Sequence, residues 1–158
     1  MNEHFLSWLI PWLFLAISHH AEAAPQSSFA VRQVVEAPAP DAEEFTLKYP
    51  AGQETLHLAR VPLLDANAVR HAKVEKDALG YFHINVTLTL AGAKRLEEFT
   101  TKHVGGRLAI LLNRKIASAP FVREPIREGV FTITGNFSEA EAHQLARRIN
   151  ESANPKGA

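Results

Sequence analysis

The stretch ITGNFSEAEAHQLARRI, from Ile133 to Ile149, has the pattern of a strand that is followed at once by a helix. Ser138 and Glu141 have the spacing of a capping box, in which the two side chains satisfy free backbone N–H groups at the start of a helix. Apolar residues then recur at helical spacing on one face: Ala142, Leu145, Ala146 and Ile149. The stretch therefore predicts a strand, a short connection and an amphipathic helix.

The connection contains Gly135 and Asn136, and a glycine turn between a strand and a helix is also the form of many anion-binding loops. A phosphate loop would need further glycines and a lysine, which this stretch lacks. Ser138 also occupies N–H groups that an anion would bind. We therefore interpret Gly135-Asn136 as a turn and not as a ligand site.

Two elements before this stretch have clear patterns. Residues Tyr81 to Leu88 alternate apolar and polar side chains, which is typical of a half-buried strand. Thr89 then has the side chain of a helix N-cap, and Gly105-Gly106 is typical of the end of a helix. The inward face of the expected helix consists of Ala93, Leu96, Phe99 or Thr100, and His103.

A hairpin is predicted next, with strands from Arg107 to Leu112 and from Lys115 to Val122. Its turn is expected at Asn113-Arg114, because asparagine tolerates the positive φ of a tight hairpin turn. Pro120 cannot donate a backbone hydrogen bond, so the second strand should be bulged or at a sheet edge by that point. Such an edge can accept an extended peptide as an added strand.

The loop from Arg123 to Gly129 carries charges of both signs around Pro125-Ile126 and leads into a last strand, expected from Val130 to Thr134. This loop is either a solvated connection or a polar rim at a protein-binding surface. For the second alternative, the candidate binding residues are Phe121, Arg123 and Arg127.

The amino-terminal half has weaker patterns. Strands are expected within Phe29 to Glu36, Phe45 to Tyr49 and Thr55 to Leu64, and Asp65 can cap a short helical turn through Val69 to Ala72. We expect an amino-terminal extension with short strands over residues 24–55, a folded domain over 56–150, and a disordered tail over 151–158.

The first residues have the pattern of a secretory signal peptide. Phe5 to Ile17 is an apolar run of 13 residues, whereas a membrane-spanning helix needs about 20. Ala21-Glu22-Ala23 supplies the small residues of a cleavage site, so residues 1–23 are expected to be removed during export to the periplasm. The alternative is a retained segment that holds a scaffold at the membrane.

The composition excludes several classes of function. The chain has no cysteine, which excludes disulfides, thiol catalysis and cysteine-based zinc sites. Its 17 basic residues are balanced by 17 acidic ones, so it lacks the basic excess of a nucleic-acid-binding protein. We expect no nucleic acid, metal or cofactor among its ligands.

The sequence contains no strong catalytic motif. Its histidines outside the signal peptide form no H-x-x-x-H pair: His57, His71, His83, His103 and His143. Ser118 lies in Ala-Ser-Ala and not in G-x-S-x-G, so a hydrolase elbow is not supported. We expect a non-catalytic protein, and an enzyme with a dispersed site of histidines or Ser118 is the alternative.

Several short motifs occur in order between Leu88 and Ile149: G-A-K-R-L at Gly92 to Leu96, F-T-T at Phe99 to Thr101, V-G-G-R-L-A-I at Val104 to Ile110, S-A-P at Ser118 to Pro120, E-P-I at Glu124 to Ile126, and I-T-G-N-F-S-E-A-E-A at Ile133 to Ala142. With these motifs the stretch resembles the head subdomain of the first periplasmic domain of SecD, a subunit of the SecDF complex that assists protein export. A fainter match extends upstream through Leu63 to Val74.

This resemblance implies an α+β domain, in which two principal helices pack on one face of a mainly antiparallel sheet. It also implies a binding module, here expected as a free-standing exported protein, whose partner is an unfolded polypeptide, another protein or a membrane complex of the envelope. Two loops differ from the family pattern, at Asn113-Arg114 and at Ile126 to Gly129. Residues to which we assign a structural role are Gly92, Gly105, Gly106, Pro120, Gly135, Asn136, Ser138 and Glu141.

The signal-peptide interpretation predicts cleavage between Ala23 and Ala24, because Ala21 and Ala23 are the small residues that the peptidase requires. Mass spectrometry of the protein recovered from the cell envelope should give a mature chain that starts at Ala24. A mass that includes Met1 to Ala23 would contradict this interpretation and support the anchored scaffold.

Overall fold

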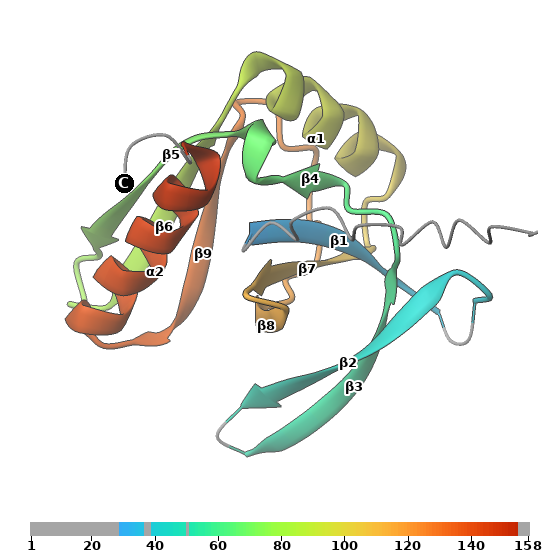
Figure 1. Ribbon diagram of the computed structural model, residues 1–158, viewed down its shortest axis with the longest axis horizontal. Coiled ribbons are helices and arrows are strands. Elements are labelled where there is room, and N and C mark those ends of the chain that lie inside the picture. The colour runs from blue at the N-terminus through green and yellow to red at the C-terminus, as the bar shows by residue number, and fades with distance from the viewer. Residues whose placement is uncertain (1–28, 37–38, 50, 155–158) are drawn as a thin grey trace, which may run out of the picture.

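The computed structural model describes residues 29–36, 39–49 and 51–154, which form two antiparallel sheets and two α-helices (Figure 1). The larger sheet consists of β1 (Phe29–Val35), β2 (Ala42–Tyr49), β3 (Gly52–Ala59), β4 (Leu64–Asp65), β7 (Arg107–Leu112) and β8 (Lys115–Ser118). The smaller sheet consists of β5 (Val69–Lys76), β6 (Phe82–Leu88) and β9 (Val130–Phe137). The helices are α1 (Leu90–Lys102), α2 (Glu139–Ala153) and the short 3-10 helix η1 (Ala66–Ala68).

The strand order is β2-β3-β1-β7-β8 in the larger sheet, with β4 paired to β1, and β5-β6-β9 in the smaller one. Both helices and both sheets contribute to one main core, whose fully buried side chains include Phe29, Leu64, Ile84, Leu96, Ile133 and Ile149. The predicted α+β class with two principal helices is therefore confirmed.

The helix ends follow the sequence patterns. The Thr89 hydroxyl accepts a hydrogen bond from the Gly92 N–H at 3.2 Å, and Gly105, just after α1, has a φ of 86°. Ser138 and Glu141 form both halves of the predicted capping box at the start of α2. Gly92 is needed for packing, because a Cβ there would lie 2.7 Å from the Ala68 carbonyl oxygen.

The predicted turn at Gly135-Asn136 is wrong, because both residues lie inside β9. Phe137 still pairs with Phe82 of β6, and the next pair is Ile133 with Ile84. The residues between these pairs form a bulge in β9. A Cβ on Gly135 would lie 2.6 Å from the Phe137 ring, so this glycine makes room for a side chain of its own strand.

The predicted hairpin turn is confirmed, since Asn113 and Arg114 have φ values of 49° and 61°. The second strand is shorter than predicted, because β8 ends at Ser118. A register shift in the β7–β8 pair and the missing N–H of Pro120 interrupt the ladder. Phe121 returns to the sheet only through an isolated bridge with Arg107.

The expected separation of residues 24–55 from the domain is not seen in the structure. β1 pairs with β7 along six residue pairs and buries Phe29 and Val31 in the main core. The expected boundary before Leu56 also falls inside β3. The alternating side chains of β1 identify it as a strand but do not reveal its partner, which lies more than 70 residues later in the chain.

Two further boundaries differ from the prediction. The expected strand from Thr55 to Leu64 is divided between β3 and β4, and the helical turn that Asp65 caps is η1, which ends before Val69. Helix α2 continues to Ala153, so the first residues of the expected tail are helical. The signal peptide and residues 155–158 lie outside the described residues.

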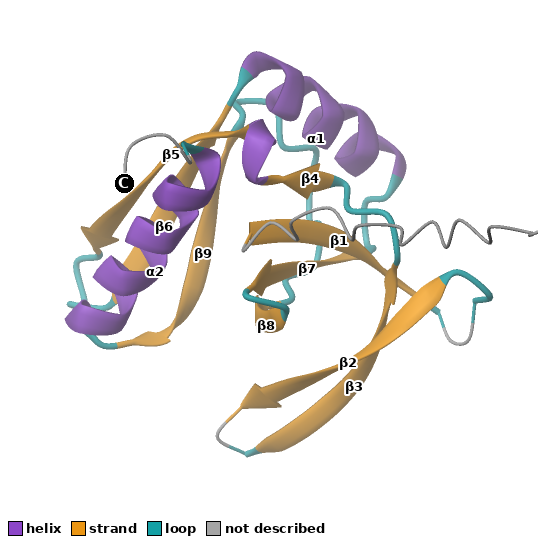
Figure 2. Ribbon diagram, viewed as in Figure 1, coloured by secondary structure: helices purple, strands orange, loops and turns teal. Residues whose placement is uncertain are grey.

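Strands β2 and β3 form a long hairpin that curls beneath β1, β7 and β8 (Figure 2). A second, smaller core lies inside this curl. Its buried members are Leu56, Leu58, Ala109 and Leu111. Two ion pairs hold the hairpin in place: Arg32 to Glu43 at 2.7 Å, and Arg107 to Glu54 at 2.8 Å.

The main core predicts a large difference between two leucines of the same helix. Leu96 is 1% exposed and Leu90 is 92% exposed. Leu96→Ala should therefore lower the free energy of unfolding by about 2–5 kcal/mol, whereas Leu90→Ala should change it by less than about 0.5 kcal/mol. Urea denaturation of both variants would measure this, and equal losses would contradict the orientation of α1.

Candidate functional site

The candidate site is a concave apolar hollow of about 310 Å³ between the two sheets, which is open to solvent. Its walls are formed by Val31, Leu96, Leu108, Ile110, Pro120, Phe121, Val122, Ile126, Val130, Phe131 and Thr132. Thr132 is the one polar side chain in this lining. The hollow is therefore suited to apolar groups, and it lacks the converging polar groups that a catalytic pocket needs.

One wall is the segment from Ala119 to Val122, which continues from β8 alongside the start of β7. The Pro120 carbonyl accepts a hydrogen bond from the Leu108 N–H at 3.0 Å. The Val122 N–H and carbonyl bond to Gly106 and Gly105, each at 2.8 Å. Since neighbouring residues of an extended chain point their backbone groups to opposite sides, those of Phe121 point away from these partners.

Arg107 fixes the same wall through its guanidinium group. Its Nε donates to the Ala119 carbonyl at 2.7 Å, and its two terminal nitrogens donate to the Glu54 carboxylate at 2.8 and 3.0 Å. The guanidinium carbon also lies 5.3 Å from the centre of the Phe121 ring, within the range of a cation–π contact. Arg107 thus joins the β2–β3 hairpin to the mouth of the hollow.

Thr100 holds the loop that covers the hollow. Its side chain is fully buried, and its hydroxyl donates to the Leu96 carbonyl at 2.8 Å while accepting from the Ile126 N–H at 3.0 Å. A buried hydroxyl that satisfies a loop N–H is costly to remove, because the N–H would lose its partner. Ile126 is therefore held against α1 at one end of the hollow.

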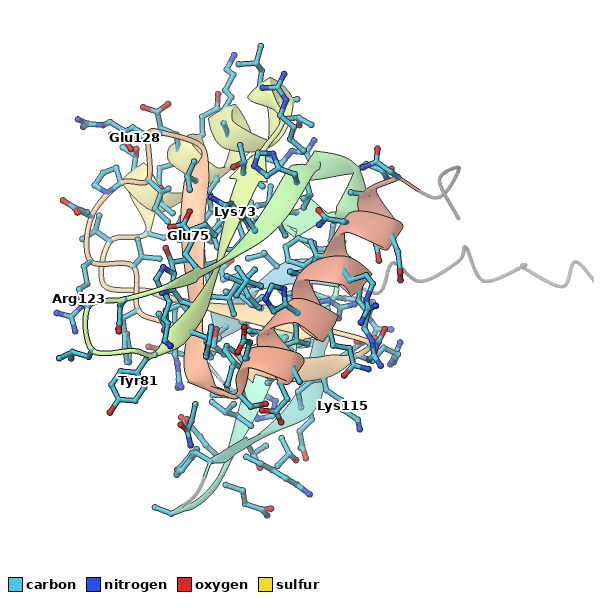
Figure 3. All side chains as sticks on the ribbon, turned by 90° about the vertical axis from the view of Figure 1, so that its left-hand side faces the viewer. Lys73, Glu75, Tyr81, Lys115, Arg123 and Glu128 are labelled. Atoms are coloured by element: carbon cyan, nitrogen blue, oxygen red, sulfur yellow. The ribbon has the colours of Figure 1, made fainter. Side chains whose placement is uncertain are left out.

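The predicted binding residues are brought together only in part. Phe121 is 65% exposed and lines the hollow. Arg127 lines a neighbouring hollow of about 430 Å³ together with Glu124 and Glu128, and its Nε lies 3.9 Å from Glu97. Arg123 is exposed and lines neither hollow. Its side chain points outward at the rim of the molecule (Figure 3).

Sequence reasoning missed the strand residues that form most of the hollow. Leu108 and Ile110 belong to a continuous apolar run, and Val130 is an apolar residue at the start of an expected strand whose 39% exposure the sequence does not reveal. The sequence also gave no reason to select Arg107, apart from its place as the charged residue at the start of that apolar run.

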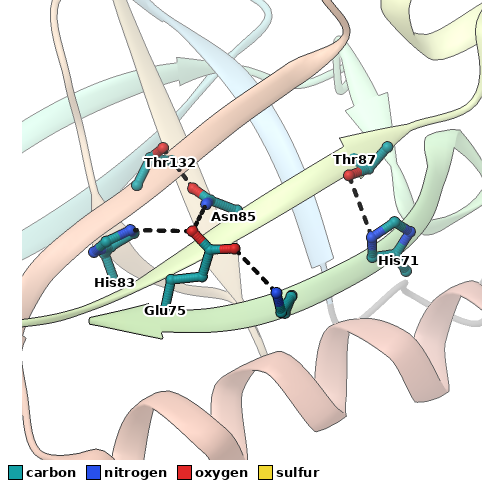
Figure 4. A network of polar contacts seen from close by, with 7 residues as sticks. His71, Glu75, His83, Asn85, Thr87 and Thr132 are labelled. Carbon is teal, nitrogen blue, oxygen red and sulfur yellow. Dashed lines mark hydrogen bonds and ion pairs between the residues drawn. The ribbon is translucent and has the colours of Figure 1, made fainter. Parts of the chain in front are cut away.

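The histidines are dispersed over the fold. His71 lies 3.4 Å from the Thr87 hydroxyl, and His83 lies 4.0 Å from a Glu75 oxygen, in a polar network on the outer face of the smaller sheet (Figure 4). Within residues 29–36, 39–49 and 51–154, no three His, Cys, Asp or Glu side chains are grouped as metal ligands. None of the helices in these ranges combines the length and the apolar composition of a membrane-spanning segment.

Comparison with known proteins gives the family. The model of the SecDF P1 head subdomain matches residues 43–155, which is more than half of the chain. The chain belongs to the SecDF P1 head subdomain family. The resemblance seen in the sequence is thereby confirmed.

Similar full-length proteins are translocase subunits. SecD of Dictyoglomus turgidum is 40% identical over 93 residues, which cover 59% of this chain and 23% of that protein. SecD of Aquifex aeolicus is 37% identical over 95 residues, covering 60% and 19%. SecDF of Thermus thermophilus is 34% identical over 94 residues, covering 60% and 13%. The chain therefore spans less than a quarter of these relatives' length.

Solved structures of SecDF have the same fold. A crystal structure of SecDF in a super-membrane-facing form has a TM-score of 0.62 and 26% identity, covering 77% of this chain and 18% of that one. A structure of SecDF described as a membrane component that enhances protein export has a TM-score of 0.59 and 25% identity, covering 77% and 60%. The structural similarity therefore extends over about three quarters of the chain.

The Arg107–Glu54 pair predicts a pH-dependent stability. The hydrogen bonds from Arg107 hold the pKa of Glu54 below its ordinary value of 4.5. A carboxylate with a lowered pKa in the folded state contributes stability above pH 4.5, and the contribution is lost as the pH falls through the folded-state value. Glu54→Gln should therefore be less stable than the wild type at neutral pH and should approach it in acid.

Urea denaturation of both proteins between about pH 7 and pH 3 would measure this difference. Glu44→Gln is the matched control, since Glu44 is an exposed glutamate of the same hairpin with no ion pair in the part of the chain that the structure describes. A difference between wild type and Glu54→Gln that stays constant with pH would contradict the assignment.

Proposed function

We propose that this protein is a non-catalytic binding module, exported to the periplasm, that holds apolar segments of unfolded polypeptides. The observation that carries this proposal is the open apolar hollow with Phe121 at its mouth. A large exposed aromatic side chain beside an apolar cavity is costly in water unless it has a partner. An unfolded polypeptide supplies apolar side chains that a folded protein keeps inside.

The edge of β9 that faces away from β6 has no strand partner among the described residues, and it supports a specific binding geometry. The Gly129 carbonyl accepts a hydrogen bond from the Leu88 N–H at 2.8 Å, so the backbone groups of Gly129, Phe131 and Ile133 point toward β6. Those of Val130 and Thr132 therefore point away from β6, along the wall of the hollow. An extended segment could pair with this edge while its side chains enter the hollow.

The sequence predicts that a peptide can add as a strand along Lys115 to Val122. The structure supports this only for β8, from Lys115 to Ser118. β8 is the last strand of its sheet, so one of its sides has no strand partner among the described residues. Beyond Ser118 the backbone groups of Pro120 and Val122 are engaged by Gly105, Gly106 and Leu108, and only those of Phe121 point away from these partners. We therefore assign the added strand to β9 and keep Phe121 as its main side-chain contact.

Arg123 and Arg127 would form part of the rim of this site. Glu124 and Glu128 share the loop with them, and Glu97 lies beside Arg127. The rim is therefore mixed in sign, which favours polypeptides of varied sequence and gives charge a smaller role than apolar contact. Attraction by the two arginines would raise the association rate and weaken with salt.

The family supports this class of partner. The similar proteins are named as protein translocase subunits, and one SecDF structure is described as enhancing protein export. A domain of such a machine meets polypeptides before they fold. A complex in the envelope is the second partner that we propose on this ground. The scattered histidines give the enzymatic alternative no comparable support.

The proposal predicts that Phe121→Ala/Arg127→Glu binds an unfolded model polypeptide more weakly than the wild type. The loss of an aromatic contact together with a reversed rim charge should lower the affinity by about tenfold, which corresponds to about 1.4 kcal/mol. Fluorescence anisotropy of a labelled, reduced and carboxymethylated polypeptide at low and high salt would measure it.

Leu79→Ala/Arg95→Glu is the matched control, because it removes an exposed apolar side chain and reverses a charge elsewhere on the surface. This variant should bind like the wild type. Equal affinities for all three proteins would place polypeptide binding outside the hollow, and an absence of binding by the wild type would contradict the proposed function.

A further inference from the structure

A second surface is defined by four basic residues around the β7–β8 turn: Lys48, Arg114, Lys115 and Arg148. We call it the basic face. Lys48, Arg114 and Lys115 line a hollow of about 290 Å³ between β2 and β8, and Lys115 and Arg148 line one of about 270 Å³ on the other side of β8. The two hollows share Lys115 and Ile116, so they lie side by side with one strand between them.

Three of the four cations of the basic face, Lys48, Lys115 and Arg148, have no acidic residue beside them in the two hollows. No acidic residue lines either hollow, although the whole chain has as many acidic as basic residues. Lys48, Lys115 and Arg148 are exposed and form no ion pair with any residue that the structure describes. Like charges gathered in this way repel one another and attract an anionic partner.

The floors of the two hollows are apolar. Phe45 and Ile116 form the floor between β2 and β8, and the second floor consists of Leu112, Ile116, Ala117, Phe137 and Leu145. A flat anionic surface, such as a lipid headgroup layer, would contact the cations but leave these floors empty. An extended chain with alternating side chains would fill both the apolar floors and the positions beside the cations.

We propose that the basic face binds an extended acidic peptide segment. Its carboxylates would meet Lys48 and Arg114 on one side of β8 and Lys115 and Arg148 on the other, and its apolar side chains would enter the two hollows. This site is separate from the hollow at Phe121, since no residue that lines that hollow lines either of these two. Lys115 and Arg123, which follows Phe121 closely in the chain, also lie on opposite sides of the molecule in Figure 3. It would let the protein hold a defined acidic partner while the other site holds polypeptide.

The probe for this proposal is a labelled peptide of alternating glutamate and leucine residues, titrated by fluorescence anisotropy. Lys48→Glu/Lys115→Glu should lower its affinity by about tenfold or more, and added salt should weaken wild-type binding. Arg70→Glu/Arg95→Glu changes the net charge equally at exposed positions outside the basic face, so it should keep most of the affinity. Circular dichroism would verify that both variants are folded.

Three further comparisons decide the chemistry of the partner. Replacing the peptide's glutamates by glutamine should abolish the salt-sensitive binding, and replacing its leucines by serine should weaken it. Phe121→Ala/Arg127→Glu should leave unchanged the part of the binding that Lys48→Glu/Lys115→Glu removes. Equal loss in both charge-reversal variants would overturn the proposal, because only net charge would then matter. Vesicles of anionic phospholipid that bind through Lys48 and Lys115, with no peptide binding, would overturn it in favour of a membrane surface.

Discussion

The guanidinium group of Arg107 is the interaction on which the arrangement of this protein depends most. It binds the β3 residue Glu54, the carbonyl of Ala119 and the ring of Phe121. These partners belong to a distant hairpin, to the segment after β8 and to the mouth of the apolar hollow. A lysine at this position could not replace it, because a single ammonium group lacks the planar fork that serves a carboxylate and a carbonyl together.

The hollow exists because β7 belongs to two cores. Leu108 and Ile110 point toward the main core, while Ala109 and Leu111 point into the curl of the β2–β3 hairpin. Because β7 packs against the hairpin on one face, it stays in the larger sheet, whereas β9 pairs with β6 in the smaller sheet. A space is therefore left between the two sheets. Thr100 bonds to Ile126 and Arg107 bonds to Ala119, so the segment from Ala119 to Ile126 is held over the space between the sheets and does not fill it. What remains is an apolar site with a rigid frame.

The sequence predicts best what is decided locally. The capping box of Ser138 and the turn at Asn113-Arg114 depend on neighbours a few residues away, and both are confirmed. Gly135 was misinterpreted because its role depends on the Phe137 ring and on the register with β6. The role of Asn150 is likewise not predictable from the sequence, since its side chain forms hydrogen bonds with the N–H and the carbonyl of Ala72, 78 residues away. The family resemblance gave the fold class, while the candidate site needed the packing of distant strands.

Backbone amide NMR would test most directly whether polypeptide binds in the hollow. An unfolded polypeptide without acidic residues should be used, so that the basic face is not engaged. The account predicts shift changes concentrated at Leu108, Phe121, Ile126 and Val130 to Thr132. Changes confined to the outer face of the smaller sheet or to the basic face, with those residues unaffected, would contradict it.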